Sequence, residues 1–145
     1  MPPLNHAVLS ASSAYRWLEC PPSALATADI PDETTIYAQE GSAAHEMAEY
    51  KIRWHLGEKD LAPPNIGNFN AEEIDRYTDS YAYYATDKIE TIRKICPDAI
   101  VMVEQRLDFS NYVKDGFGTG DLVIVADDVL QVIDFKYGKG VTVSA

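Results

Sequence analysis

The chain has 145 residues, 46% of them hydrophobic and 24% charged, which is the size and composition of one globular domain. Its apolar runs are shorter than the roughly 18 residues of a membrane-spanning helix, and its start lacks the basic and apolar regions of a signal peptide, so we expect a cytoplasmic protein without membrane contacts. Its 12 basic and 23 acidic residues give a net charge of −11, which argues against a broad basic surface for nucleic acid.

The first thirty residues predict two short helical segments. Ser10 or Ser12 can cap a helix that runs through Trp17 and Leu18, and two consecutive prolines end it before a second turn over residues 23–28. We expect Trp17 and Leu18 to lie in the core.

A long helix is expected over residues 36–56, ending at a glycine. Gly41, Ala44, Ala48 and Ile52 recur at helical spacing and form a narrow stripe of small side chains, which permits close packing against a sheet. His45 borders this stripe. A lone histidine on such a face is more often a core residue than a ligand. His6 and His55 have no such context and are expected at the surface.

A second long helix begins after Asn70, which forms a capping-box-like start with Glu73 and is followed by a helix that Pro97 ends. The expected core stripe consists of Ile74, Tyr77, Tyr81, Tyr84, Ile89, Ile92 and Ile95. Tyrosines can also stack on nucleic-acid bases, but aromatic residues at helical spacing are more often core.

Residues 99–107 alternate like a strand, with Glu104 in the middle of otherwise apolar positions. Two interpretations of Glu104 stay open. The first is a contact with a metal or its ligands, and the second is an edge strand whose polar face meets water.

The stretch from Gly118 to Lys136 predicts a hairpin. Two short β-branched runs, residues 122–125 and 129–135, flank an Asp-Asp turn. Because side chains alternate along a strand, Asp134 and Lys136 share one face, and the hairpin can bring Asp121 to the same end.

Asp121, Asp134 and Lys136 would then converge. Two carboxylates at one point repel each other unless a hard cation lies between them, and Mg²⁺ is commonly held by one or two carboxylates. A lysine beside them can act on an attacking water and stabilise charge developing on a phosphate. The alternative to a metal site is that Asp121 is a turn residue and that Asp134 and Lys136 form a solvated ion pair.

This pattern resembles the PD-(D/E)xK nuclease superfamily, and most of all its RecB-like exonuclease branch, within an uncharacterised phage and prophage group. The resemblance rests on Gly-x-Gly-Asp ending at Asp121 and on Asp-x-Lys at Asp134 and Lys136. Two other stretches agree. Residues 9–22 resemble the branch's amino-terminal serine and Cys-Pro segment, and residues 40–49 resemble its first helix, which bears a histidine.

The resemblance implies a Mg²⁺- or Mn²⁺-dependent deoxyribonuclease with an α/β, restriction-endonuclease-like fold. In that fold, amino-terminal helices pack on the three-stranded antiparallel start of a mixed sheet. The implied catalytic side chains are His45, Asp121, Asp134 and Lys136. The implied metal ligands are Asp121, Asp134, His45 and the main-chain carbonyl of Phe135. Weaker candidates for contacts around these ligands are Glu40, Glu49 and Glu104.

Cys20 and Cys96 are interpreted as reduced thiols, with Cys20 buried, and no disulfide is expected. Some RecB-like nucleases use a cysteine at the position of Cys20 in an iron-sulfur cluster. Two cysteines cannot complete a four-cysteine set, so we expect no iron-sulfur cluster here.

The sequence departs from the RecB-like branch after Lys136, because a helix carrying Gln-x-x-x-Tyr usually follows and the sequence stops at Ala145. We therefore expect one truncated nuclease-like domain over residues 1–145, whose activity on its own is an open question. A second copy or a partner chain would cover the exposed sheet face. The alternative function is a catalytically inactive DNA-binding or phage accessory module that keeps the fold.

Overall fold

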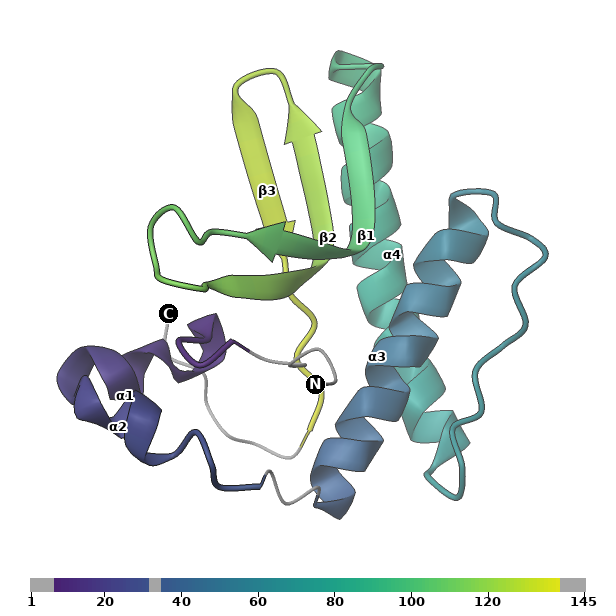
Figure 1. The fold of residues 1–145 in the computed structure, drawn as a ribbon. Coiled ribbons are helices and arrows are strands. Elements are labelled where there is room, and N and C mark those ends of the chain that lie inside the picture. The colour runs from purple at the N-terminus through teal and green to yellow at the C-terminus, as the bar shows by residue number, and fades with distance from the viewer. Residues whose placement is uncertain (1–6, 32–34, 139–145) are drawn as a thin grey trace. The chain divides into compact units, whose positions relative to one another are not determined.

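A computed structural model describes residues 7–31 and 35–138, and Figure 1 shows their arrangement into helices and one sheet. The sheet has three strands in the order β1-β2-β3, which confirms the expected mixed α/β class with an antiparallel three-stranded sheet. His6 lies outside the described residues. The elements are η1 Ala11–Ser13, α1 Ala14–Glu19, α2 Pro22–Ala26, α3 Ile36–His55, α4 Ala71–Ile95, β1 Ile100–Asp108, β2 Phe117–Ala126 and β3 Val129–Ile133.

The chain divides into two compact units, and the division passes through two of the strands. The first unit contains the described residues 7–31 and 105–120, and the second contains residues 35–104 and 121–138. Strands β1 and β2 therefore each contribute residues to both units. Every candidate site residue named above belongs to the second unit.

In the first unit, the indole Nε1 of Trp17 donates a 2.9 Å hydrogen bond to the carbonyl of Ser10, and Trp17 is partly buried. Leu18 is 67% exposed, so its expected place in the core is wrong. Cys20 is also exposed, which corrects the expected buried thiol, although both cysteines are free. A six-residue helix such as α1 has little more than one turn. Its Trp17 side chain is partly buried, and its Leu18 side chain points to solvent.

The serine cap expected for the first helix is also wrong in detail. Ser10 precedes η1, but its hydroxyl makes no capping bond to the backbone and lies 2.7 Å from the hydroxyl of Ser13. Side-chain hydroxyls can satisfy each other instead of a helix end, so residue type alone does not fix a cap.

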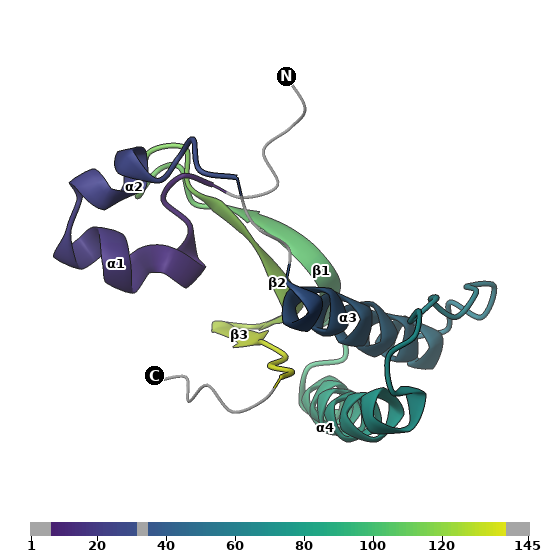
Figure 2. The ribbon, with the colours of Figure 1, turned by 90° about the horizontal axis from the view of Figure 1, so that it is seen from below.

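In the second unit, α3 and α4 pack side by side, as Figures 1 and 2 both show. Thr35 caps α3 by accepting a bond from the N–H of Ala38, and Asn70 caps α4 as predicted. Ala44, Ala48 and Ile52 are buried as predicted, but Gly41 is only partly buried. The expected packing against the sheet holds for Ile52, which clusters with β2, whereas Ala44 and Ala48 cluster with Ile74 of α4 and with Phe135.

The buried face of α4 differs from the predicted stripe. Ile74, Thr78, Ala85 and Ile89 are the fully buried residues of this helix. Tyr77, Tyr84 and Ile95 were expected in the core and are exposed instead. The stripe is displaced because Thr78 tolerates burial: its hydroxyl donates a 2.8 Å bond to the carbonyl of Ile74.

Lys51 of α3 reaches across to α4 and joins the two helices. Its ammonium lies 2.8 Å from the hydroxyl of Thr78, 3.0 Å from Asp75 and 2.6 Å from Asp79. This cluster explains why a threonine can occupy the centre of the α3–α4 contact.

The β2–β3 hairpin forms as predicted, with Leu122 opposite Ile133 and Ala126 opposite Val129. The pairing ends at Leu122 and Ile133, and Asp121 and Asp134 are the residues directly beyond this last pair. In β3, Leu130 and Val132 are exposed while Gln131 and Ile133 are partly buried, and Phe135, which follows β3, is buried. The predicted alternation therefore holds from Leu130 onward and fails at Val129, which is exposed. What covers this exposed apolar face stays a prediction.

Among the described helices, none combines the length and the apolar character that a bilayer crossing requires.

A core cluster of the second unit surrounds Phe135 and includes Ala44, Met47, Ala48 and Ile74. This cluster fixes the segment after β3 against α3 and α4, and it thereby positions the residues on either side of Phe135.

Candidate metal centre

Asp121 lies at the start of the buried half of β2, with its side chain only 14% exposed. Its Oδ2 accepts a 2.6 Å hydrogen bond from the backbone N–H of Phe135. The same oxygen lies 3.5 Å from Nε2 of His45. One carboxylate therefore joins the sheet, the segment after β3 and helix α3.

His45 is oriented by its own helix. Its Nδ1 donates a 2.8 Å hydrogen bond to the carbonyl of Gly41, which leaves Nε2 facing Asp121. The ring also packs edge-on against Phe135, with 5.1 Å between the ring centres. Histidines that bind metals in proteins commonly hold the second ring nitrogen in this way, because it fixes the tautomer and the ring plane.

The charges of this pair reinforce each other. The hydrogen bond with Asp121 raises the pKa of His45 to about 9, and it outweighs burial, which acts in the opposite direction. Burial acts to raise the pKa of Asp121, but the bonds from His45 and from the N–H of Phe135 hold it below its usual value. Without a metal, the pair is an imidazolium beside a carboxylate over most of the physiological pH range.

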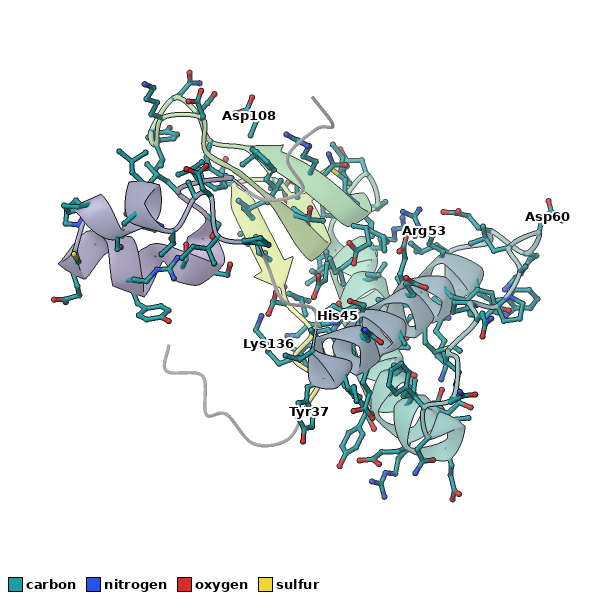
Figure 3. The ribbon with its side chains drawn as sticks, turned by 60° about the horizontal axis from the view of Figure 1, so that its bottom comes forward. Tyr37, His45, Arg53, Asp60, Asp108 and Lys136 are labelled. Atoms are coloured by element: carbon teal, nitrogen blue, oxygen red, sulfur yellow. The ribbon has the colours of Figure 1, made fainter. Side chains whose placement is uncertain are left out.

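Asp134 and Lys136 form an ion pair on the exposed face of the chain after β3, where their side chains are 49% and 65% exposed. They are neighbours on one face as predicted, in the solvated ion pair that the sequence left open as the alternative to a metal site. Figure 3 shows Lys136 on this segment and His45 on α3, with Arg53 further along the same helix. The exposure leaves Lys136 free to change partners.

Glu104 of β1 lies next to His45 and Asp121. It lines one small cavity together with His45, Glu49, Tyr81 and Asp121. Its backbone has a φ of +51° within β1, which is rare for a residue other than glycine. Burial raises the pKa of Glu104, and the charges of Asp121 and Glu49 raise it further.

Arg53 is a residue that the sequence analysis missed. Its Nε donates a 2.7 Å bond to Glu49, and its Nη2 donates a 3.1 Å bond to the carbonyl of Val103. Arg53 thereby holds both Glu49 and the backbone beside Glu104. The four-residue spacing of Glu49 and Arg53 on a helix could have indicated the ion pair, but not the bond to the strand.

Tyr81 was predicted only as part of the core. Its ring packs on Phe135 with 4.7 Å between the centres, while its buried hydroxyl has no hydrogen-bond partner among the described residues. Burial raises the pKa of Tyr81, followed by the charges of Asp121, Asp134 and Glu104. The neutral hydroxyl of Tyr81, without a partner among the described residues, therefore lies near the carboxylates of Asp121 and Glu104.

Glu40 lies elsewhere. It accepts a 3.4 Å bond from the hydroxyl of Tyr137 and lines a neighbouring pocket, not the cavity beside Asp121. Within the described residues, no three His, Cys, Asp or Glu side chains stand close enough together to form a ready set of metal ligands. His45 with Asp121 and Asp134 with Lys136 are two separate charge pairs.

The donor types nevertheless fit a divalent ion. Asp121 and Asp134 supply carboxylates, His45 supplies a nitrogen whose ring is already oriented, and a backbone carbonyl follows at Phe135. Carboxylate and carbonyl oxygens suit Mg²⁺ and Mn²⁺. The cavity beside Tyr81 is too small for a water molecule as it stands, so the unpaired hydroxyl would gain a partner only if the surrounding side chains moved apart to admit water with an ion.

Residues 6–145 match the model of a protein family described as "Protein of unknown function (DUF2800)", and the chain belongs to this family. No solved structure matches the chain.

Proposed function

We propose that the chain is a Mg²⁺- or Mn²⁺-dependent nuclease that hydrolyses phosphodiester bonds in DNA. In this proposal it belongs to the RecB-like branch of the PD-(D/E)xK superfamily, has a restriction-endonuclease-like fold and is encoded by a phage or prophage. The observation that carries the proposal is the position of His45. Residues separated by 76 positions in the sequence meet with Nε2 of His45 3.5 Å from Asp121, and Nδ1 is already held by Gly41.

The ion would be held by Asp121, Asp134, Nε2 of His45 and the carbonyl of Phe135. When bound, it would supply positive charge to the phosphate and lower the pKa of a nearby water. His45 must first lose the proton that its contact with Asp121 stabilises. The bond from Nδ1 to Gly41 keeps the ring in place while Nε2 changes role.

Lys136 would act on the attacking water and on the charge that develops on the phosphate. In the metal-free state it is paired with Asp134, on an exposed side chain. An ion at Asp134 would compete for that carboxylate and release the ammonium toward the substrate. The buried N–H of Phe135 would meanwhile keep Asp121 in place.

The net charge of −11 supports a second candidate, a catalytically inactive module that keeps the nuclease fold. A strongly acidic chain attracts DNA poorly unless bound cations offset the carboxylates. The two candidates differ in one respect that can be measured, since only the nuclease needs Asp134 for a chemical step.

An end-labelled DNA assay separates them. The protein would be incubated with single- and double-stranded DNA and with Mg²⁺ or Mn²⁺, in parallel with Asp134→Ala and with Asp128→Ala. Asp128 is an exposed acid in the turn of the same hairpin, so its loss is the matched control for charge. We expect Asp134→Ala to lose at least a hundredfold in cleavage rate and Asp128→Ala to cleave like the wild type. Folded wild-type protein that cleaves neither DNA with either metal would contradict the nuclease proposal and favour the inactive module.

A further inference from the structure

A second pocket opens beside Lys136 and has a volume of about 270 Å³. It is separate from the small cavity at His45 and Asp121. Lys136 is its link to the candidate site, because this lysine lines the pocket and also pairs with Asp134. Its walls are formed by Glu40, Glu73, Tyr77, Lys136, Tyr137 and Gly138.

Two tyrosines give this pocket an aromatic wall. The rings of Tyr77 and Tyr137 lie 5.9 Å apart and meet edge to face. The ring of Tyr137 also packs near that of Phe135, with 6.3 Å between the ring centres. Tyr77 is 47% exposed, so part of its ring is open to the pocket and to solvent. Partly exposed rings beside a cavity offer a surface on which a flat ligand can pack.

Two carboxylates give the same pocket its polarity. Glu73 stands in the first turn of α4, and Glu40 accepts a hydrogen bond from the hydroxyl of Tyr137. The pKa of Tyr137 is raised by burial and then by the charges of Glu40 and Glu73, so both acids act on that hydroxyl. Carboxylates repel phosphate and accept hydrogen bonds from N–H groups.

We propose that this pocket is a subsite for one nucleobase, and that it selects bases that carry an exocyclic amino group. The inference rests on the proposed nuclease function, since it places the base beside the phosphate that Lys136 would contact. One face of the base would pack on one of the two rings while its edge met the other, because the rings of Tyr77 and Tyr137 stand at 79° to each other. Its amino group would donate to Glu40 or Glu73. Adenine, cytosine and guanine carry such a group, whereas thymine has a methyl group, two carbonyl oxygens and only its ring N3–H as a donor.

The subsite is tested without metal and without phosphate. Saturation-transfer NMR on the full chain would use the deoxynucleosides of adenine, cytosine and guanine, with thymidine as the comparison. We expect the three amino-bearing nucleosides to bind at least tenfold more tightly than thymidine. Because no phosphate is hydrolysed in this measurement, it reports on the pocket even if the protein proves to have no nuclease activity.

Two variants and a matched control locate the binding. Tyr77→Ala should weaken binding of deoxycytidine at least tenfold, and Glu73→Gln should reduce the preference over thymidine. Tyr83→Ala removes an exposed tyrosine from the same helix and should leave both quantities unchanged.

Three results would overturn the subsite: equal binding of thymidine and deoxycytidine, equal losses in the Tyr77 and Tyr83 variants, or tighter binding of N-acetyl-arginine amide than of any nucleoside. The last result would assign the pocket to a basic side chain of a protein partner. A normal subsite with no metal-dependent cleavage would instead contradict the nuclease function while leaving the pocket in place.

Discussion

The backbone N–H of Phe135 donates a 2.6 Å hydrogen bond to Oδ2 of Asp121, so this carboxylate supports the chain as well as the candidate site. Asp134, one residue before Phe135, is about half exposed, and among the described residues its ion-pair partner is Lys136. Asp121 and Asp134 look equivalent in the sequence, but of the two only Asp121 accepts a hydrogen bond from the buried backbone in the described part of the chain.

We expect Asp121→Ala to lower the free energy of unfolding of the metal-free protein by about 1–3 kcal/mol, because it leaves a buried N–H without its acceptor. Asp134→Ala should change it by less than about 0.5 kcal/mol, as for other exposed positions. Urea unfolding followed by circular dichroism measures both. Asp121→Asn is the control, since its amide oxygen can still accept the bond. Equal losses for both alanine variants would contradict the structural role of Asp121.

The stability of the metal-free protein should depend on pH through His45. The pKa of His45 is raised from 6.5 to about 9 in the folded state, mainly by the bond with Asp121. The stabilisation by the pair is therefore fully present below about pH 6.5 and is lost as the pH rises through 9. Unfolding midpoints measured from pH 6 to pH 9.5 should fall for the wild type. His45→Gln should be flatter over this range, and an identical decline in that variant would rule out His45 as the cause.

The sequence predicted the elements of the second unit well. The Asn70 cap of α4, most of the stripe of α3 and the hairpin register follow from local chemistry. The buried stripe of α4 could not be predicted as well, because the hydroxyl of Thr78 is satisfied by Lys51, 27 positions away, as well as by the carbonyl of Ile74. The burial of Leu18 and Cys20 was predicted wrongly for a different reason, because a short helix does not by itself determine which of its sides is buried.

For the site, spacing predicted the Asp134–Lys136 pair, and the family resemblance supplied His45. Neither could predict that Arg53 holds the backbone of Val103, or that Glu104 adopts a positive φ beside Asp121. Such long-range contacts leave no periodic trace in the sequence.

Lys136→Ala should separate chemistry from metal binding. Lys136 is paired with Asp134, so its removal takes away a positive charge that opposes a cation there. We expect Mn²⁺ affinity to stay the same or rise, measured by calorimetry, while the cleavage rate falls by about two to four orders of magnitude. A loss of Mn²⁺ binding in this variant would contradict the role assigned to Lys136.

Tyr81→Phe should leave the metal-free protein as stable as the wild type or slightly more stable, because it removes a buried hydroxyl that lacks a partner among the described residues. If water enters the site with an ion, the hydroxyl gains a partner, and the melting temperature should then rise less on adding Mn²⁺ to the variant than to the wild type. A clear loss of stability without metal would indicate that Tyr81 has a structural hydrogen bond instead.

The central claim is that His45 and Asp121 share one ion, and Mn²⁺ bound to the protein tests it most directly. Pulsed electron paramagnetic resonance detects a nitrogen ligand through its coupling to the Mn²⁺ electron spin. We expect wild-type protein to bind one Mn²⁺ with a coupled imidazole nitrogen, and we expect His45→Gln to lose that coupling and to lose more affinity for Mn²⁺ than for Mg²⁺. Binding of Mn²⁺ with the same spectrum in both proteins, or no binding that depends on Asp121 and Asp134, would contradict the metal centre.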